Sequence, residues 1–261
     1  MITHVADLTL HTVSLDGVRQ FYNGLLGLPI ASETASEIRF RVTPFTTLTF
    51  AETYEPVAPA HFAFEVPWSS FSDVVAYLKR EAGIPLLRWP DGRETIDDGT
   101  LANAYFRDGD GHLLEVSAHR YVREDALPQN GPVKILYLRE VGFPVEDVSA
   151  FRGWLSGRFG MKLAKVHDDF TFAIGGTAHA VVVSKRRRWI PIGMLALPPN
   201  MTVTFGLSGR DAPARIRAWA EGETVLSADG DGLTILRDGY RIRFAAKTDV
   251  PADIAARLHL P

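Results

Sequence analysis

The chain has 261 residues, a length that at roughly 150 residues per domain predicts about two domains. Hydrophobic residues make up 46% and charged residues 23%, with a formal charge of −3, so the composition is that of a folded protein and excludes a basic surface for nucleic acid or acidic lipid. Cysteine is absent, which excludes disulfides, thiolate catalysis and sulfur-ligated metals, so any metal must bind His, Asp or Glu.

The N-terminus and the hydropathy pattern predict a soluble, cytoplasmic protein. The opening residues, MITHVADLTLHTV, contain no basic region followed by an apolar segment, and no stretch approaches eighteen uninterrupted apolar residues. We therefore expect neither a targeting segment nor a membrane as partner.

The first part of the chain predicts a strand, a helix and then more strands. Alternation over residues 6–13 predicts the first strand, and LDGVRQFYNGLLGLPI after it has apolar residues at helical spacing before Gly27, which can end a helix. Alternating runs at 37–42 and 46–51 are bounded by turn-forming residues and predict antiparallel strands. This segment is therefore a βαβββ unit.

The same order of elements restarts with HFAFEV. An amphipathic helix follows, and Gly83 is placed to end it. The expected elements are a strand at 61–66, a helix at 71–82, and strands at 86–89, 102–106 and 112–118.

The segment YVREDALPQNGPVK, at 121–134, mixes charge with proline and glycine and predicts a linker. After it the same order appears twice more, more faintly, over 139–163 and 203–246. We therefore predict an α+β fold of four βαβββ units, paired into two cup-shaped, barrel-like domains at 1–120 and 135–250. Alternate strand residues line the concave side of such a cup, where a ligand would bind.

Two motifs together resemble those of the vicinal-oxygen-chelate superfamily, which contains glyoxalases, bleomycin-resistance proteins and ring-cleaving (extradiol) dioxygenases. They are FYNGLLGL in the first helix and YFRDGDGHLLE before the last strand of the second unit, which HFAFEV opens. The resemblance covers residues 5–119 well and 135–247 in outline. It implies glyoxalase-type domains in which a cup holds one divalent metal ion.

The resemblance also implies a ligand set: Asp7 on the first strand, His61 opening the second unit and Glu115 closing it. Asp7 stands where the family usually has His. Because strand alternation places His11 on the same face as Asp7, either residue is a candidate for the first ligand. One His with two carboxylates suits hard divalent ions such as Mn²⁺, Mg²⁺ or Fe²⁺, and Zn²⁺ or Ni²⁺ also remain candidates.

An ionised Glu115 inside a strand needs a metal or an arginine as partner, because an unpaired buried carboxylate destabilises the fold by several kcal/mol. Candidates for proton transfer near this site are Glu115 itself, His119, Tyr105 and Glu65.

In the second half of the chain, the positions that match the ligands are Glu140, Thr202 and Arg243. Two of these three cannot serve as metal ligands, and Arg243 brings a positive charge to the last position. We therefore expect the second cup to be metal-free, and either structural or able to hold an anionic group.

The run KRRRW at 185–189 combines arginine with tryptophan, a pattern that can bind nucleic acid. A single run of this kind on an acidic chain is usually a solvated loop or strand end. Its position suits an entrance to the second cup or a contact between subunits of a homodimer. We expect no nucleic-acid partner.

The DGDG sequence at 108–111 resembles the start of a calcium-binding loop. It lacks the later acidic positions and the closing glutamate of such a loop, so a hairpin turn is the better prediction.

The resemblance implies a metal-dependent enzyme acting on a small oxygen-chelating substrate, either as a dioxygenase, and so an oxidoreductase, or as a lyase or isomerase. The four-unit layout is most similar to that of the ring-cleaving dioxygenases, although these commonly use two His and one Glu in the C-terminal domain. The alternative is a metal-free protein that sequesters a small molecule, as bleomycin-resistance proteins do. Candidate apolar walls for such a cup are Trp68, Trp89, Phe45 and Phe62.

Overall fold

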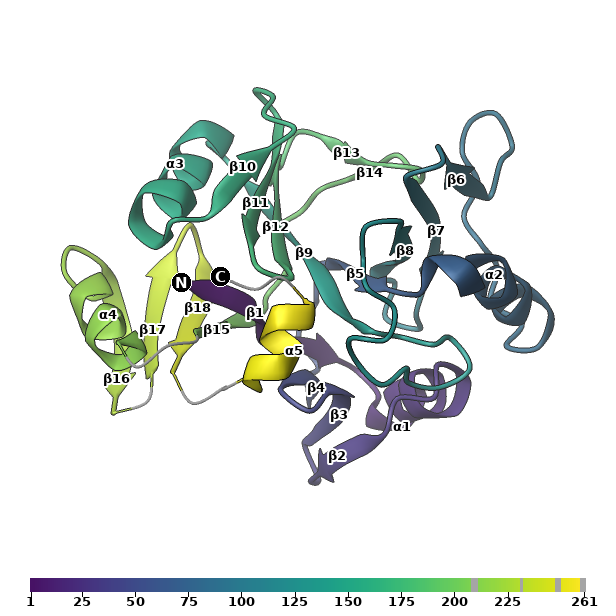
Figure 1. Cartoon of the computed structure of the whole chain (residues 1–261), viewed down its shortest axis with the longest axis horizontal. Coiled ribbons are helices and arrows are strands. Elements are labelled where there is room, and N and C mark those ends of the chain that lie inside the picture. Colours follow the sequence, from purple (N-terminus) through teal and green to yellow (C-terminus); the bar gives the residue numbers. More distant parts are fainter. Residues whose placement is uncertain (208–210, 231, 247–249, 259–261) are drawn as a thin grey trace.

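The computed structural model describes residues 1–207, 211–230, 232–246 and 250–258 (Figure 1). Four βαβββ units follow one another along the chain, as the sequence predicts. The elements of the first unit are β1 (Ile2–Thr12), α1 (Leu15–Val18), a π-helical continuation (Arg19–Leu25), β2 (Ile30–Glu33), β3 (Glu37–Thr43) and β4 (Thr46–Glu52). Those of the second unit are β5 (His61–Glu65), a 3₁₀ turn (Trp68–Ser70), α2 (Phe71–Arg80), β6 (Thr95–Asp97), β7 (Leu101–Arg107) and β8 (Leu113–His119).

The second half of the chain repeats this order and adds a small hairpin and a terminal helix. The elements of the third unit are β9 (Tyr137–Val145), α3 (Val148–Phe159), β10 (Lys162–Ala164), β11 (Phe170–Gly175) and β12 (Ala178–Ser184), followed by the hairpin strands β13 (Arg188–Trp189) and β14 (Met194–Leu195). Those of the fourth unit are β15 (Thr202–Leu207), α4 (Ala212–Trp219), β16 (Thr224–Asp229), β17 (Gly232–Arg237) and β18 (Tyr240–Ala245), with α5 (Ala252–Arg257) after them.

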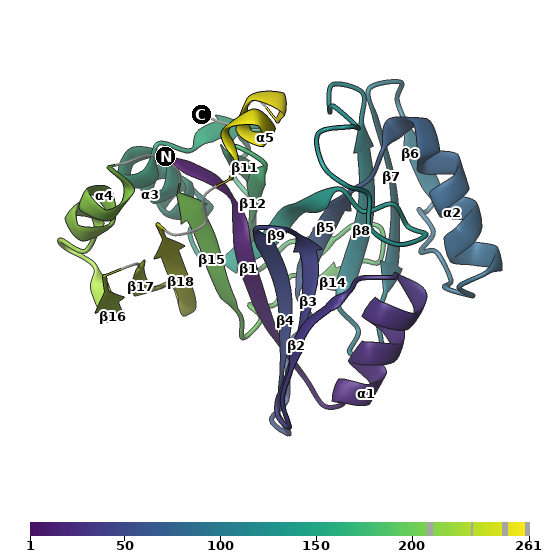
Figure 2. The same cartoon turned by 60° about the horizontal axis from the view of Figure 1, so that its bottom comes forward.

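The units pair in a different order from the one expected along the chain. β1 pairs with β15, so the first and fourth units share one eight-stranded sheet, in the order β16-β17-β18-β15-β1-β4-β3-β2. β5 pairs with β9, so the second and third units share the other, in the order β10-β11-β12-β9-β5-β8-β7-β6 (Figure 2). Residues 121–134, expected as a linker between domains, therefore connect β8 to β9 within one sheet.

The strand expected at 86–89 is not formed. Pro85 and Pro90 flank this segment and cannot donate a ladder hydrogen bond, although the Leu87 N–H donates to the Tyr105 carbonyl at 2.8 Å. Residues Thr95–Asp97 form the edge strand β6 on β7 instead.

Local sequence explains where the helices begin and end. Ser14 precedes α1, and its hydroxyl accepts a hydrogen bond from the Gly17 N–H at 3.1 Å; Asp147 caps α3 in the same way through the Ala150 N–H at 2.8 Å. Gly160 ends α3 with a φ of 70°, a left-handed conformation that glycine adopts without strain. Among the described residues, no helix has both the length and the apolar character needed to cross a membrane.

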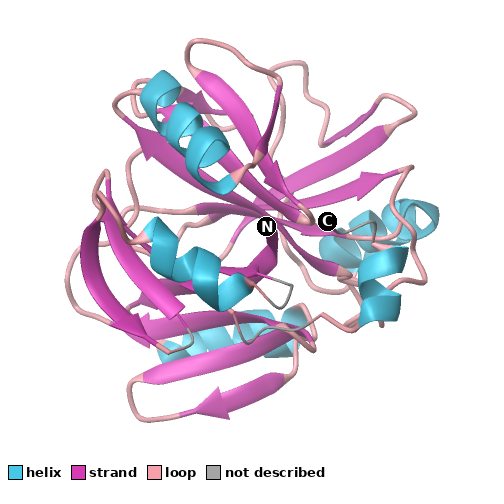
Figure 3. Cartoon of the chain, turned by 60° about the vertical axis from the view of Figure 1, so that its left-hand side comes forward, coloured by secondary structure: helices cyan, strands magenta, loops and turns pink. Residues whose placement is uncertain are grey.

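A single large apolar cluster joins the two sheets to α1, α2, α3 and α4. Tyr22, Phe62, Phe143 and Phe205, one from each unit, are among its fully buried side chains. The helices lie against the strands at the periphery of the molecule (Figure 3). Since strand residues alternate between faces, the face of each sheet turned away from this cluster is free to carry polar side chains.

The connection between β8 and β9 packs against the end of the first helix through two glycines. Gly131 has a φ of 61°, and a Cβ atom on it would lie 2.2 Å from the Leu26 carbonyl oxygen and 2.9 Å from the Gly27 Cα. Since both contacts are with backbone atoms, a side chain cannot be accommodated by a rotamer change.

Replacing Gly131 with alanine tests this contact. We expect Gly131→Ala to lower the free energy of unfolding by about 2 kcal/mol or more, because the overlap adds to the cost of a positive φ. Gly92→Ala is the matched control: Gly92 has a φ of 86°, but a Cβ atom there would meet no other atom within 4 Å, so only the conformational cost of about 1 kcal/mol applies. Urea unfolding of both variants measures the difference, and equal losses would contradict the role of the contact.

Candidate metal centre

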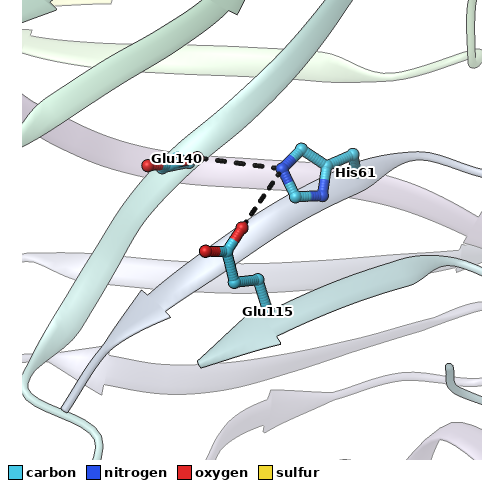
Figure 4. A group of neighbouring side chains, drawn as sticks. All are labelled: His61, Glu115 and Glu140. Atoms are coloured by element: carbon cyan, nitrogen blue, oxygen red, sulfur yellow. Dashed lines mark ion pairs between the residues drawn. The ribbon is translucent and has the colours of Figure 1, made fainter. Parts of the chain in front are cut away.

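Three ionisable side chains from three adjacent strands meet on the face of the β5–β9 sheet that lines a cavity (Figure 4). His61 comes from β5, Glu115 from β8 and Glu140 from β9. The His61 Nε2 atom lies 3.8 Å from an oxygen of Glu115 and 3.8 Å from an oxygen of Glu140. These distances are too long for hydrogen bonds, and all three side chains are buried.

A β-bulge in β9 explains why Glu140 points into this site. The β5–β9 ladder pairs Ala63 with Glu140 but Phe64 with Leu138, so Arg139 is an extra residue on β9. A bulge redirects side chains locally, and here two consecutive residues, Arg139 and Glu140, both line the same cavity. Leu138 on one side and Val141 on the other belong to the apolar core.

The backbone fixes which nitrogen of His61 faces the carboxylates. The Nδ1 atom lies 3.1 Å from the Leu113 carbonyl oxygen, which can only accept a hydrogen bond. The Nδ1–H therefore donates to Leu113, and Nε2 is the nitrogen that faces Glu115 and Glu140 and offers a lone pair when it carries no proton. This is the orientation that a metal-binding histidine requires.

The carboxylates and the imidazole perturb one another strongly. Burial and the charge of Glu140 raise the pKa of Glu115 to about 7, against opposing contributions from His61 and from hydrogen bonds with Ser117 and Tyr105. Burial alone would lower the pKa of His61, but Glu140 and Glu115 outweigh it and raise that pKa. Groups that titrate this abnormally in a cavity indicate a functional site.

Two further buried groups, Arg139 and His179, act on the charge of Glu140. Burial would raise the pKa of Glu140, but His61, Arg139 and His179 lower it. Burial and the charge of Arg139 lower the pKa of His179 to about 3, so this imidazole is neutral. Glu65 is buried with them, so three carboxyl groups and His61 share one buried guanidinium, that of Arg139, and a divalent cation would be a further partner for this group.

A cavity of about 520 Å³ opens onto these groups. The Trp189 ring packs over His61 with 4.9 Å between ring centroids, and Tyr105 lies 6.5 Å from the same imidazole. The ring centroids of Trp89 and Tyr105 are 6.0 Å apart. The site is therefore a polar cluster in a cavity whose wall includes several aromatic side chains, which suits a small organic ligand.

The structure brings together His61 and Glu115, but it does not bring Asp7 or His11 to them. Both residues lie on β1, in the other sheet. The Asp7 carboxylate accepts hydrogen bonds from the hydroxyls of Thr9, Thr47 and Thr49, which supply partners without a metal. The expectation that the first unit supplies the third residue of the cluster fails because the second unit pairs with the third.

Glu140 takes that third position. The sequence indicated it as the place that matches a ligand in the third unit, but the expected pairing assigned it to another cup. In the other sheet, the matching positions Asp7, Thr202 and Arg243 form no cluster of metal-binding groups among the described residues. Arg243 is instead paired with Asp229 at 2.9 Å.

The residues expected to transfer protons lie along the same cavity. Tyr105 is opposite Glu115 in the β7–β8 ladder and lines the cavity, as does His119. Burial raises the pKa of Tyr105 well above its ordinary value, and the charges of Glu115 and Glu140 add to this, so its hydroxyl keeps its proton at neutral pH. Glu65 is buried behind His119, which lies 2.9 Å from it.

Of the four aromatic residues expected to form walls, only Trp89 lines this cavity. Phe62 lies in the apolar core, while Trp68 packs against that core and Phe45 against a smaller apolar cluster.

One interpretation of the sequence placed the KRRRW run at the entrance to the second cup. In the structure the run does not lead to the cup of the β1–β15 sheet. Arg187, Arg188 and Trp189 line the cavity that contains His61, and the hairpin of β13 and β14 passes over it.

A second group of metal-binding residue types, Asp108, Asp110 and His112, lies at the turn before β8. The His112 Nδ1 accepts a hydrogen bond from the Ala60 N–H at 2.9 Å, so the Nε2 atom of the neutral ring carries the proton and has no lone pair for a metal. Asp108 already accepts bonds from the Tyr22 hydroxyl at 2.6 Å and the His112 N–H at 2.8 Å. This cluster stabilises the turn, as expected for a hairpin.

Comparison with known proteins confirms the fold. No model of a protein family matches the sequence, and no curated protein matches it. Among solved structures, one described as "putative dioxygenase from Bacillus subtilis subsp. subtilis str. 168" is 16% identical with a TM-score of 0.71, over 97% of this chain and 87% of that one. Glyoxalase I from Zea mays is 15% identical with a TM-score of 0.59, over 98% of this chain and 95% of that one. The α+β fold with two glyoxalase-type cups, expected from the vicinal-oxygen-chelate resemblance, is therefore present in this chain.

The close packing of Trp189 over His61 depends on Gly142 in β9. A Cβ atom there would lie 2.9 Å from Trp189 and 3.1 Å from the His61 Cβ. We expect Gly142→Ala to displace the Trp189 ring and to change the near-ultraviolet circular dichroism of the protein. Gly153→Ala, at an open position in α3, is the control and should leave that spectrum unchanged. An unchanged spectrum in the Gly142→Ala variant would contradict this prediction, because it would show that the added methyl group does not displace the Trp189 ring.

Proposed function

We propose that this protein is a divalent-metal-dependent enzyme that acts on a small substrate with two neighbouring oxygen atoms, and that His61, Glu115 and Glu140 hold the metal. The convergence of these three residues carries the proposal: one imidazole lone pair and two carboxylates, from three strands, surround a point at the base of an aromatic cavity. Metal ligands about 2.0–2.2 Å from a common ion lie roughly 3–4 Å from one another, which agrees with the two distances of 3.8 Å.

The donor set favours a hard ion. Two carboxylates and one imidazole suit Mn²⁺ or Fe²⁺ better than ions that prefer sulfur or several nitrogens, although Zn²⁺ and Ni²⁺ also bind such residues. When bound, the ion would supply Lewis-acid stabilisation of negative charge on the substrate oxygens. Three protein ligands would leave positions free for two substrate oxygens, an arrangement that both ring-cleaving dioxygenases and isomerase- or lyase-type members of this fold require.

The chain's own residues would do the rest. Tyr105, beside Glu115, keeps a proton on its phenolic oxygen and can donate it to a substrate oxygen. His119, farther along β8, is a second group able to accept or donate a proton. Trp89 and Trp189 exclude water from the polar cluster and orient a flat substrate.

Metal binding by variants tests the ligand set. We expect Glu140→Ala and Glu115→Ala to weaken Mn²⁺ binding by at least about a hundredfold. Removing a residue that only hydrogen-bonds to a metal ligand lowers metal affinity by up to about a hundredfold, and removing the ligand itself should cost at least as much. Equilibrium dialysis followed by elemental analysis measures the affinity.

Asp7→Ala is the matched control, because Asp7 is the residue that the family pattern would name and the structure places in the other sheet. It should leave Mn²⁺ binding within about twofold of the unchanged protein. A large loss in this variant, or unchanged binding in both glutamate variants, would overturn the assignment.

A metal-free binding protein is the second candidate function, and the aromatic wall of the cavity favours it. In that case the purified protein would contain no divalent metal and would not take up Mn²⁺, yet would bind an intact aromatic compound. The two carboxyl groups make this function the weaker candidate, because Arg139, 3.8 Å from Glu140, is the one buried arginine or lysine beside them among the described residues.

A further inference from the structure

The hairpin of β13 and β14 is a separate piece of structure beside the cavity. Its two strands, Arg188–Trp189 and Met194–Leu195, form a two-stranded sheet of their own, apart from both eight-stranded sheets. The hairpin follows β12 and extends toward β7 (Figure 1). Trp189 and the residues on either side of it line the cavity that contains His61. The hairpin is therefore part of the wall of the site without being part of the sheet that carries the site.

The hydrogen bonds of the hairpin close on the hairpin itself. The Gly193 N–H donates to the Trp189 carbonyl at 2.8 Å, and the Ala196 N–H donates to the Arg187 carbonyl at 2.9 Å. In the part of the chain that the structure describes, no hydrogen bond or ion pair joins residues 188–197 to a residue outside 187–197. Side-chain packing therefore holds the hairpin against the sheet, and a segment held in this way can open locally while the rest stays folded.

The packing that holds the hairpin is a small apolar cluster. The hairpin contributes the buried side chains of Trp189 and Ala196, and the β5–β9 sheet contributes those of Leu113, Val181 and Val183. This cluster is distinct from the large one that joins the two sheets to the helices. Moving the hairpin away would therefore expose a few apolar side chains and leave the main core closed.

Trp189 covers one of the proposed metal ligands. Its ring centroid lies 4.9 Å from that of His61, and the lack of a side chain at Gly142 lets the ring come this close. His61 and Glu115 are each only 4% exposed, and Glu140 is 7% exposed. An incoming ion must reach all three side chains, and the indole ring occupies the space beside the imidazole. Of the elements around the ligands, the hairpin is the one that can move without breaking a strand pairing of the large sheets.

We propose that residues 188–197 form a lid over the site, and that Trp189 is the side chain that holds this lid closed over His61. The inference rests on the proposed function, which makes His61, Glu115 and Glu140 the metal ligands. In the open state the Trp189 ring leaves His61, and an ion can enter or leave. In the closed state the ring shields the metal position from water. Trp189 is then a gating residue, which governs how fast the ion exchanges rather than how tightly it binds.

The kinetics of metal exchange test the role of Trp189. A lid that is closed most of the time slows association and release by the same factor, because both steps need the open state. We expect Trp189→Ala to raise both rates for Mn²⁺ and the full-length protein by about tenfold, as for a closed state favoured roughly ten to one, and to change the Kd by less than about threefold. Rapid mixing with a fluorescent divalent-metal indicator measures both rates.

Leu195→Ala is the matched control. Leu195 stands on the other strand of the hairpin and is 44% exposed, so its loss leaves the contact between Trp189 and His61 in place. Both rates should stay within about twofold of those of the unchanged protein, as is usual for a surface substitution. A merely structural role of Trp189 predicts a different result for Trp189→Ala, in which release alone becomes faster and the affinity falls. That result, or unchanged rates in Trp189→Ala, would overturn the inference.

Hydrogen exchange tests the opening itself, without any metal. In the metal-free protein we expect the amides of Gly193 and Ala196 to exchange at least about a hundredfold faster than the hydrogen-bonded amides of β9 and β12, because they open with the hairpin alone. Trp189→Ala should make these two amides exchange about tenfold faster again, and Leu195→Ala should not.

Hairpin amides that exchange as slowly as those of β9 and β12, or that do not respond to Trp189→Ala, would also contradict the lid. Failure of the unchanged protein to bind Mn²⁺ would instead count against the proposed function. The exchange of the Gly193 and Ala196 amides would then still decide whether the hairpin opens and whether Trp189 holds it closed.

Discussion

The antiparallel pairing of β5 with β9 is the contact on which the site depends. It joins the second unit to the third, so that His61 and Glu115 from one half of the chain face Glu140 from the other. The bulge at Arg139 lies in the same ladder and turns both that residue and Glu140 toward the cavity. Without this register, Arg139 would not reach Glu65, and the buried carboxylates of the site would lose their one close guanidinium.

Several features of this site could be predicted from the sequence because they depend on local patterns. The alternation in HFAFEV and HLLEVSAH places His61, Glu65, Glu115 and His119 on one face. In the structure His61, Glu115 and His119 line one cavity, and Glu65 contacts His119. The helix ends at Gly27 and Gly83 follow from residue type alone, and both glycines have positive φ. The order of elements within each unit was predictable for the same reason.

The partner of each unit could not be predicted in this way. All four units present a first strand with the same alternation, and that pattern is satisfied equally by pairing units in chain order or by pairing the outer two and the inner two. The choice lies in the ladders that join strands far apart in sequence, such as Phe62 with Val141 between β5 and β9, and Leu8 with Val203 between β1 and β15. Neither ladder has a signature that a single sequence reveals. The error at Asp7 was therefore one of topology, since Glu140 already stood at the matching position of the third unit.

The two sheets surround carboxylates at matching positions with different partners. At Asp7, three threonine hydroxyls supply the hydrogen bonds that a carboxylate requires, and Arg243 across the sheet is neutralised by Asp229. At Glu115 the hydroxyl of Ser117 is a comparable donor, at 2.7 Å, whereas Glu140 has, within the described residues, the Arg139 guanidinium and the His61 Nε2 atom, each 3.8 Å away. Buried groups that lack donors in this way destabilise the fold unless something cationic joins them. The arrangement is therefore that expected of a binding site. Since β5 and β8 precede the connection at residues 121–134 and β9 follows it, both halves of the chain are needed to form the site.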